Sequence, residues 1–283
     1  MKLGLFGINF GACAQPETAT RIARAAEAAG FESVWTGEHV VLPDPQAPPS
    51  PSPPQTPFLD PAVALAYVAA HTTRLKIATG IVILPQRNPV VLAKEMASVD
   101  VVSNGRLVFG VGVGYLRPEF DAIGADFARR GARMDEHLDA ILALWTQEKP
   151  AYAGETIRFA GIDAQPRPVQ KPHPPIVIGA TTAPAWRRAV ARANGWYGFA
   201  MDPATAAAQL AGLAEAAKRV ARPAALGRLD LTVTPPPGVP DRDTLRRYED
   251  LGVARLVLLP TARTGDELVA FVERAAEAFR SPG

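Results

Sequence analysis

The sequence predicts an α/β fold of the (β/α)8 type, a TIM barrel in which parallel strands alternate with helices. Short apolar runs alternate with amphipathic helical patterns along the chain, and there are eight such runs. A last helical pattern at 267–280 follows the eighth run. Strands that alternate with helices pair in parallel, and eight such units can close on themselves. An open, doubly wound sheet is the alternative; the complete final strand–helix unit favours closure.

Each predicted strand is a short apolar run that is followed by a loop and then by a helical pattern. Side chains in such strands are buried on both faces, so they form continuous apolar runs and do not alternate. The predicted strands lie at 3–8, 33–36, 75–80, 107–111, 176–178, 196–199, 229–233 and 255–259.

The predicted helices begin where a capping side chain precedes a proline, which suits the first helical position because that residue's N–H has no partner there. A threonine and a glutamate three residues apart form a capping box before the last helix. The predicted starts are Pro16, Asp60-Pro61, Asn88-Pro89, Pro184, Asp202-Pro203 and Thr264–Glu267. Glycine, which ends helices readily, is predicted to do so at positions 30, 105, 195 and 252.

Two insertions interrupt the alternation, one after the second and one after the fourth predicted strand. Residues 43–61 contain nine prolines, so the loop at about 43–60 is predicted to be irregular. It is either a disordered excursion or a lid, because barrel enzymes build their sites on this side. The segment at about 149–166 contains a predicted hairpin that turns at Gly154. We expect residues 1–283 to form a single barrel domain with these two insertions.

The composition is that of a folded protein without structural staples. Of 283 residues, 48% are apolar and 20% charged, which excludes a disordered chain. A single cysteine excludes a disulfide framework and a cysteine-based zinc site. The four histidines have no HxH or HExxH spacing, so we expect no metal. The net charge of +2 gives little support for a nucleic-acid partner.

The N-terminus superficially resembles a short signal peptide, because an apolar stretch follows Lys2. Asn9 interrupts that stretch, and it reads better as a buried first strand. No run of 18 apolar residues occurs, so we expect no membrane span and a cytoplasmic location.

The first candidate for chemistry is Gly37-Glu38-His39, which directly follows the second predicted strand. A histidine beside a carboxylate suits a proton donor or a contact to a cofactor ring. The alternative is an ordinary surface loop pair. The position at the mouth of the predicted barrel favours a function.

Glycines and apolar residues mark the ends of the third and fourth predicted strands. The apolar stretch at 80–85 suits the face of a flat ring, or is simply a long buried strand. Gly110, Gly112 and Gly114 leave one strand face bare, so that a ligand or another backbone can approach closely. They are not a dinucleotide fingerprint, because Arg117 stands where the third glycine is required.

A turn of small residues and hydroxyls follows the fifth predicted strand. Gly179, Ala180, Thr181 and Thr182 precede a helix that begins near Pro184. The backbone N–H groups at a helix N-terminus, with hydroxyls beside them, suit a phosphate. Ordinary helix capping by Thr182 is the alternative.

The order of these motifs resembles the luciferase-like monooxygenase superfamily, and within it the oxidoreductases that use the deazaflavin coenzyme F420. The resemblance covers nearly the whole chain and is weakest from about residue 225. It is carried by GFESVWTGEHVVLP, FLDPAVALAYVAA, the block RLKIATGIVILPQRNPVVLAKEMASVDVVSNGRLVFGVGVGYLRPEF and PPIVIGATT. The resemblance implies a flavin or deazaflavin ring that lies across the carboxyl ends of the strands.

The resemblance also implies roles for individual residues. It implies a non-proline cis peptide at Ile81–Val82, or else at Gly80–Ile81, whose bulge supports the ring. His39 contacts the ring or the substrate as the catalytic residue, with Glu38 and Tyr115 as supports. The turn at 179–182 holds the cofactor phosphate. The implied cofactor-binding residues are Gly80, Ile81, Val82, Gly112, Gly114, Gly179, Ala180, Thr181, Thr182 and Phe199.

Two positions depart from the pattern of some relatives. Tyr115 stands where some relatives carry an acidic proton donor, and the aromatic residue that some carry after the histidine falls near Pro43. No sugar-phosphate site is therefore carried over to this chain.

The resulting hypothesis is hydride transfer between F420 and a small organic substrate. An FMN-dependent monooxygenase on the same fold is the first alternative; the acidic tail of F420 would favour a basic rim, for which Arg87 and Arg117 are candidates. A non-catalytic flavin-binding protein is the second. A Schiff-base isomerase or aldolase is disfavoured, because none of the six lysines follows a predicted strand. The apolar mouth indicates a hydrophobic or aromatic substrate, and relatives suggest a homodimer.

Overall fold

The protein is a closed (β/α)8 barrel, as the sequence predicts. A computed structural model describes residues 1–179 and 181–280. The barrel strands follow the order β3-β2-β1-β11-β10-β9-β8-β5, all parallel, and pairing of β3 with β5 closes the ring. They are β1 Lys2–Phe6, β2 Ser33–Thr36, β3 Lys76–Thr79, β5 Leu107–Gly112, β8 Ile176–Gly179, β9 Gly195–Gly198, β10 Asp230–Val233 and β11 Arg255–Leu258.

The third barrel strand is interrupted and then resumes. After β3 the chain leaves the ladder at Gly80 and Ile81, and β4 (Val82–Ile83) resumes parallel pairing with β5. The long apolar run predicted to be one strand is therefore two short strands with an irregular step between them. This step lies at the carboxyl ends of the barrel strands, where barrel enzymes carry their chemistry.

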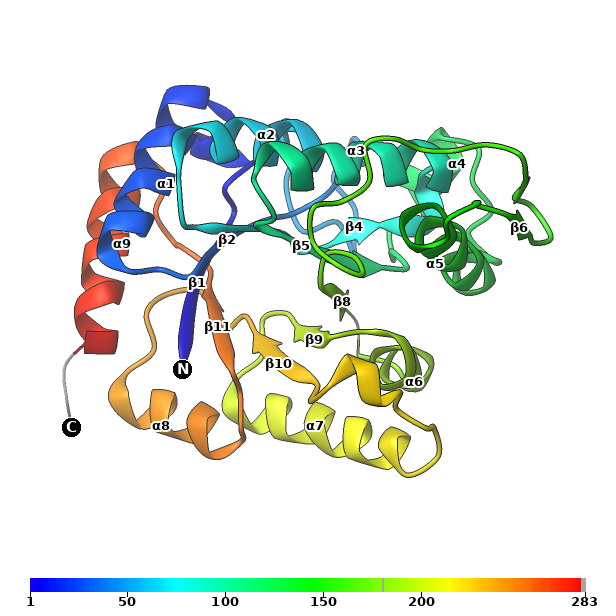
Figure 1. Cartoon of the computed structure of the whole chain (residues 1–283). Coiled ribbons are helices and arrows are strands. Elements are labelled where there is room, and N and C mark those ends of the chain that lie inside the picture. The colour runs from blue at the N-terminus through cyan, green and yellow to red at the C-terminus, as the bar shows by residue number, and fades with distance from the viewer. Residues whose placement is uncertain (180, 281–283) are drawn as a thin grey trace.

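The helices surround the barrel as an outer layer (Figure 1). They are α1 Pro16–Ala29, α2 Pro61–His71, α3 Pro89–Val102, α4 Arg117–Ala122, α5 Arg130–Thr146, α6 Ala183–Arg192, α7 Pro203–Ala217, α8 Arg242–Asp250 and α9 Gly265–Arg280. Short 3-10 turns lie at Gly11–Ala14, Leu84–Gln86 and Ala224–Leu226.

Side-chain caps are present at several of the helix starts that the sequence predicts. The Asp60 carboxylate accepts from the Ala62 N–H at 2.8 Å, and Asn88 and Asp202 cap α3 and α7 in the same way. The predicted helix end at Gly195 is wrong: α6 ends at Arg192, and Gly195 begins β9. A Cβ there would lie 2.9 Å from the Asp230 carbonyl oxygen, so close strand contact explains that glycine.

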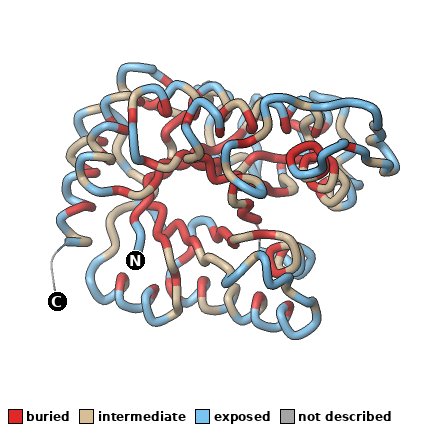
Figure 2. Tube along the Cα trace, viewed as in Figure 1, coloured by how far each residue is buried: buried red, intermediate tan, exposed pale blue. Residues whose placement is uncertain are grey.

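The core has two parts, one inside the barrel and one between the barrel and the helices. Figure 2 shows buried residues along the central strands and on the inner sides of the helices, with exposed residues outside. The interior cluster takes alternate residues of the strands. It consists of Phe6, Trp35, Ala78, Val108, Val177, Tyr197 and Val257.

An ion-pair network closes the amino end of the barrel. Arg255, at the start of β11, contacts Glu32 at 2.9 Å and Asp230 at 3.3 Å, and Lys76 lies 3.3 Å from Glu32. Burial alone would raise the pKa of Glu32, but the hydrogen bonds and charge of Arg255 outweigh it and lower that pKa to about 2. This end of the barrel therefore serves stability.

The proline-rich loop ends against the mouth of the barrel. Its residues from 43 to 57 form no helix or strand. Its last part is anchored, because the Asn9 side-chain amide donates to the Leu59 carbonyl at 2.7 Å and the Leu59 N–H donates to the Asn9 carbonyl at 2.9 Å. The Phe58 ring stacks on the Phe10 ring at 5.0 Å. The loop thus delivers Phe58 to the strand ends.

The second insertion is the hairpin that the sequence predicts. Strand β6 (Tyr152–Ala153) pairs antiparallel with β7 (Arg158–Phe159), and the Gly154 N–H donates to the Ile157 carbonyl at 2.8 Å. Among residues 1–179 and 181–280, no helix is both long and apolar enough to span a membrane.

Candidate active site

His39 is held at the barrel mouth by a buried carboxylate. Its Nδ1 lies 3.1 Å from Oε1 of Glu119, and only 10% of the His39 side chain is exposed. The same Glu119 oxygen accepts the Val40 N–H at 3.0 Å. Glu119 lies in the first turn of α4 and is fully buried, and its Oε2 has no hydrogen-bond partner among the described residues. The sequence predicts His39 as a candidate but not Glu119.

Two aromatic rings meet His39 edge-on. The centroid of Phe58 lies 5.4 Å from that of His39, and the centroid of Tyr115 lies at 6.2 Å. Tyr115 is half exposed. Burial and the nearby Glu119 charge raise the pKa of Tyr115, so its phenol stays protonated near neutral pH. The structure therefore brings together two of the three predicted catalytic residues, His39 and Tyr115.

Glu38, the third predicted catalytic residue, is engaged elsewhere. Its buried carboxylate accepts the Ile83 N–H and a hydrogen bond from Arg87 Nε at 2.7 Å. Arg87 also contacts Asp60 at 2.6 Å and Glu95 at 3.6 Å. Glu38 thus ties the end of β2 to the segment after β4.

The two arginines of the predicted basic rim differ. Arg87 forms ion pairs with three carboxylates, so its charge is largely engaged within the protein. Arg117 is exposed and forms an ion pair with Asp121 at 3.5 Å. Only Arg117 remains available for a rim role.

The non-proline cis peptide joins Gly80 and Ile81, so the first expectation, Ile81–Val82, is wrong and the second is confirmed. Val82 already belongs to β4 and pairs with Val111, which places the irregular step one residue earlier. Its side chain is fully buried in the layer between barrel and helices. Val82 therefore does not line the mouth, in contrast to the expected cofactor contact.

The Ile81 side chain occupies the space that two strand glycines leave. A Cβ at Gly112 would lie 2.7 Å from Ile81 Cδ1, and one at Gly179 would lie 2.8 Å from Ile81 Cγ2. Ile81 is partly exposed and packs on the cluster inside the barrel. The bare faces of Gly112 and Gly179 thus make room for a side chain of this protein. Their contact to a cofactor stays a prediction.

The neighbouring glycines serve close packing. A Cβ at Gly110 would lie 2.0 Å from the Thr79 carbonyl oxygen, and the Thr79 hydroxyl bonds both backbone groups of Gly110, at 2.7 and 2.8 Å. Gly114 has a positive φ of 75° and packs against Ile83. Gly80 lies against Trp35. Packing and backbone conformation thus account for these glycines, and the cofactor contacts of Gly80 and Gly114 stay predictions.

A row of aromatic rings runs along the strand ends from β9 toward His39. Phe199, which is 46% exposed, lies 4.9 Å from Phe6 between ring centroids, and Phe6 lies 5.7 Å from Phe10. Phe10 stacks on Phe58, which meets His39. Sequence reasoning predicts Phe199 alone. Phe6 and Phe10 lie at and shortly after the end of the first strand, and that position is the signal from which they could have been predicted.

Thr181 and Thr182 stand exposed between β8 and α6. Thr182 occupies the N-cap position of α6, but its side chain forms no capping hydrogen bond. Ordinary capping, the alternative interpretation, therefore does not use this hydroxyl. Ala180, also expected at the phosphate, lies outside the described residues.

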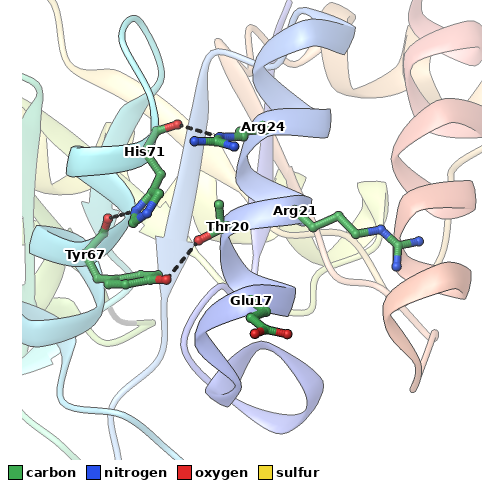
Figure 3. Close-up of a pocket in the computed structure, with 6 residues that line it drawn as sticks. All are labelled: Glu17, Thr20, Arg21, Arg24, Tyr67 and His71. Atoms are coloured by element: carbon green, nitrogen blue, oxygen red, sulfur yellow. Dashed lines mark hydrogen bonds between the residues drawn. The ribbon is translucent and has the colours of Figure 1, made fainter.

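A surface hollow of about 500 Å³ lies away from the barrel mouth, between α1 and α2 (Figure 3). Its polar groups largely satisfy one another. The Thr20 hydroxyl donates to the Tyr67 oxygen at 3.2 Å, and Arg24 Nε donates to the His71 carbonyl at 3.2 Å. Arg21 points away from the hollow toward α9, where it pairs with an aspartate. The candidate site is therefore at the mouth. Within the described ranges, no group of three or more His, Cys, Asp or Glu could hold a metal ion.

Residues 6–247 match the family described as luciferase-like monooxygenase. The chain belongs to this family. The uncharacterized protein Rv0953c of Mycobacterium tuberculosis is 34% identical over 270 residues, covering 92% of this chain and 93% of its own length. The oxygenase component of the flavin-dependent trigonelline monooxygenase of Acinetobacter baylyi is 34% identical over 157 residues, covering 55% of this chain and 40% of its own.

Solved structures of the same fold include an F420-dependent enzyme and a monooxygenase. An F420-dependent secondary alcohol dehydrogenase in complex with an F420–acetone adduct has a TM-score of 0.80 at 15% identity and covers 99% of both chains. The monooxygenase RslO1 from Streptomyces bottropensis has a TM-score of 0.77 at 22% identity and covers 98% of both chains. At these identities the likeness shows the fold. Family and neighbours together support an oxidoreductase, without fixing the coenzyme.

Proposed function

We propose that this protein transfers hydride between coenzyme F420 and a small organic substrate. The observation that carries the proposal is the arrangement at the strand ends: His39 on its carboxylate, the aromatic row, and the Ile81 side chain seated on two strand glycines. A polar, proton-bearing group thus stands beside apolar surfaces suited to a flat ring. Membership in the luciferase-like family supports the same assignment.

The residues at the mouth fit a tricyclic ring with a phosphorylated arm. Ile81 would support one face of the ring, and Phe6 and Phe199 would contact it alongside. The exposed hydroxyls of Thr181 and Thr182, at the N-terminus of α6, would bind the phosphate. When bound, a deazaflavin accepts or delivers hydride and requires no metal.

The chain's own groups supply the remaining chemistry. His39 would exchange the proton that accompanies hydride transfer, at the oxygen of the substrate. The Tyr115 phenol, which stays protonated, would donate a hydrogen bond in the same place. The aromatic row would limit access of water to the reacting atoms. The exposed Val40, Val41 and Phe199 support an apolar substrate.

An FMN-dependent monooxygenase is the second candidate. The engagement of Arg87 by carboxylates removes one of the two cations expected to attract the acidic F420 tail. The flavin-dependent trigonelline monooxygenase matches 55% of this chain. A flavin-binding protein without turnover is the third candidate.

Titration of the apoprotein with F420 and with FMN, each oxidised and reduced, separates the candidates. We expect micromolar binding of F420 and weaker binding of FMN. Micromolar FMN binding without F420 binding would overturn the proposal. Reduced F420 on the protein should then reduce members of a broad carbonyl panel. If it reduces none of them, and His39→Ala binds F420 as wild type does, the protein is a binding protein.

We also propose that the protein is a homodimer that associates through α2 and α3. Large apolar side chains are exposed on these neighbouring helices: Val63 is 64% exposed and Val91 is 55% exposed. Tyr67 on α2 and Val101 and Val102 at the end of α3 are exposed as well. Helix α2 carries no Lys, Arg, Asp or Glu. Such a surface suits a two-fold contact with its own copy. Sedimentation would test this, with a monomer at micromolar concentration as the contrary result.

A further inference from the structure

We propose that Glu119 is a positioning residue that fixes the neutral His39 ring with its proton on Nδ1. The Nε2 atom is then held unprotonated at the barrel mouth as the proton acceptor. This inference deepens the proposed function, because it says which form of His39 takes part. The tautomer itself depends on the protein alone and can be measured without any cofactor.

The hydrogen bonds of Glu119 define the tautomer. Its Oε1 accepts the Val40 N–H at 3.0 Å, and a backbone N–H can only donate, so this oxygen is an acceptor. The same oxygen lies 3.1 Å from His39 Nδ1. An ionised carboxylate has only acceptor oxygens, so Nδ1 donates to it and the neutral ring carries its proton there. Within residues 1–179 and 181–280, nothing forms a hydrogen bond with Nε2.

Packing of the neighbouring residues holds the Glu119 carboxylate in place. Glu119 lies between Leu116 and Phe120, which are 1% and 0% exposed, and Phe120 packs edge-on against Phe127 at 5.2 Å. The helix that bears Glu119 is thus anchored on both sides of it. A side chain fixed by packing holds its partner in one orientation more strictly than a surface carboxylate does.

The contacts of Glu119 satisfy only one of its two buried carboxylate oxygens. Its side chain is fully buried and Oε2 has no partner, whereas buried polar atoms are nearly always paired. In the pairing of Glu32 with Arg255, by contrast, both carboxylate oxygens accept a hydrogen bond. The cost of the unpaired oxygen is accounted for if the residue serves His39.

This arrangement sets the direction of proton movement. When an alcohol substrate is oxidised, a C–H bond breaks at the carbon that carries the hydroxyl. The hydrogen would leave with the electron pair, as hydride, to a bound deazaflavin. The O–H proton passes to His39 Nε2, and the carbonyl double bond forms. The Glu119 charge stabilises the imidazolium that results, as a carboxylate does behind a catalytic histidine. Reduction of a carbonyl is the reverse, with proton and hydride both delivered.

The groups that face His39 are Glu119 and Tyr115 on and before α4, and Phe58 on the proline-rich loop. Glu38 is adjacent in sequence but is engaged by Arg87. Glu119 is therefore the carboxylate whose removal tests the tautomer. Replacement by leucine removes the acceptor oxygen at similar size, and replacement by glutamine keeps an acceptor oxygen and removes the charge.

The test is nitrogen-15 NMR of histidine-labelled apoprotein at a pH where His39 is neutral, with its signals assigned through His39→Gln. We expect the Nδ1–H form in wild type and in Glu119→Gln, and a mixture dominated by Nε2–H in Glu119→Leu. Glu27→Gln is the matched control: Glu27 also accepts backbone N–H groups, at 2.7 to 2.9 Å from 73–75, but on the outer face of the barrel. It should leave the His39 signals unchanged.

Kinetics with bound F420 complete the test. We expect kcat to fall on the order of 10- to 100-fold in Glu119→Leu, the range for loss of a carboxylate that orients a histidine, with little change in KM for F420. An Nε2–H wild type, or a leucine variant that keeps both the Nδ1–H form and kcat, would overturn the inference. If the leucine variant does not fold, the spectra of wild type and Glu119→Gln decide: the Nε2–H form in either of them overturns the inference. Absence of F420 activity would contradict only the proposed function, because the tautomer of His39 can still be measured.

Discussion

Alanine substitutions at two glycines of one strand should differ in effect: one mainly lowers stability and the other mainly weakens cofactor binding. Gly110 and Gly112 both point into the same barrel, but different atoms face them. A Cβ at Gly110 would lie 2.0 Å from the backbone carbonyl of Thr79. A Cβ at Gly112 would lie 2.7 Å from Cδ1 of Ile81, the far end of a flexible side chain.

The magnitudes follow from what has to move. At Gly110 a strand carbonyl must shift, which costs about 1–3 kcal/mol as overpacking. The two hydrogen bonds between Thr79 and Gly110 are then lost, at about 1 kcal/mol each. We therefore expect Gly110→Ala to lower the free energy of unfolding by about 3–5 kcal/mol, a fall in Tm of roughly 10 °C for a chain of this size. Gly112→Ala should cost about 1 kcal/mol, because Ile81 can rotate.

Calorimetry and F420 titration of both variants form the assay. Because Gly112→Ala displaces Ile81, it should weaken cofactor binding about tenfold, equivalent to about 1.4 kcal/mol, while the protein remains folded. The reasoning is refuted if Gly110→Ala melts within about 2 °C of wild type. It is also refuted if Gly112→Ala is the less stable of the two.

Three further predictions concern other parts of the molecule. Because the folded pKa of Glu32, about 2, lies below its ordinary value of 4.5, its contribution of at most about 3 kcal/mol is present above about pH 4.5 and lost as the pH falls toward 2; urea denaturation across this range should show a shallower acid loss in Glu32→Gln. Arg87→Met leaves the Glu38 carboxylate buried without its cation and should destabilise by about 3–5 kcal/mol, whereas an unchanged midpoint of unfolding would contradict the role of this pair. Val63→Glu puts a charge on the outer face of α2 and should give a monomer with unchanged circular dichroism; a sedimentation coefficient equal to that of wild type would contradict the proposed interface.

The sequence predicts the elements well because the signals for them are local. Asp60 and Asn88 cap the helices that begin one residue later, and each predicted apolar run overlaps one observed strand. His39 was found because it directly follows such a run. The closure of the barrel followed from the number of strand–helix units and the direction of strand pairing.

The errors concern partners that are distant in the sequence. Glu119 stands 80 positions from His39, and no short motif joins them. A glycine such as Gly112 records that a side chain is missing but not that Ile81 fills the space. The ion pairs of Arg87, a candidate for the basic rim, were not predicted because the carboxylates around it come from other elements. The cis bond lies one residue earlier than first predicted, so Val82 is a core side chain and Ile81 lies at the mouth.

The proline-rich loop is held at residues 57–59, and these contacts do not constrain the length of the rest of the loop. Asn9 forms hydrogen bonds with Leu59, the Gly11 N–H donates to the Pro57 carbonyl at 3.1 Å, and the Phe58 ring contacts the His39 ring. Since the entropy of closing a loop changes slowly with its length, residues 44–56 can be shortened or extended while these three fastenings persist. Residues 44–56 can therefore be exchanged for a segment of another length or composition, with Phe58 and its anchors left unchanged.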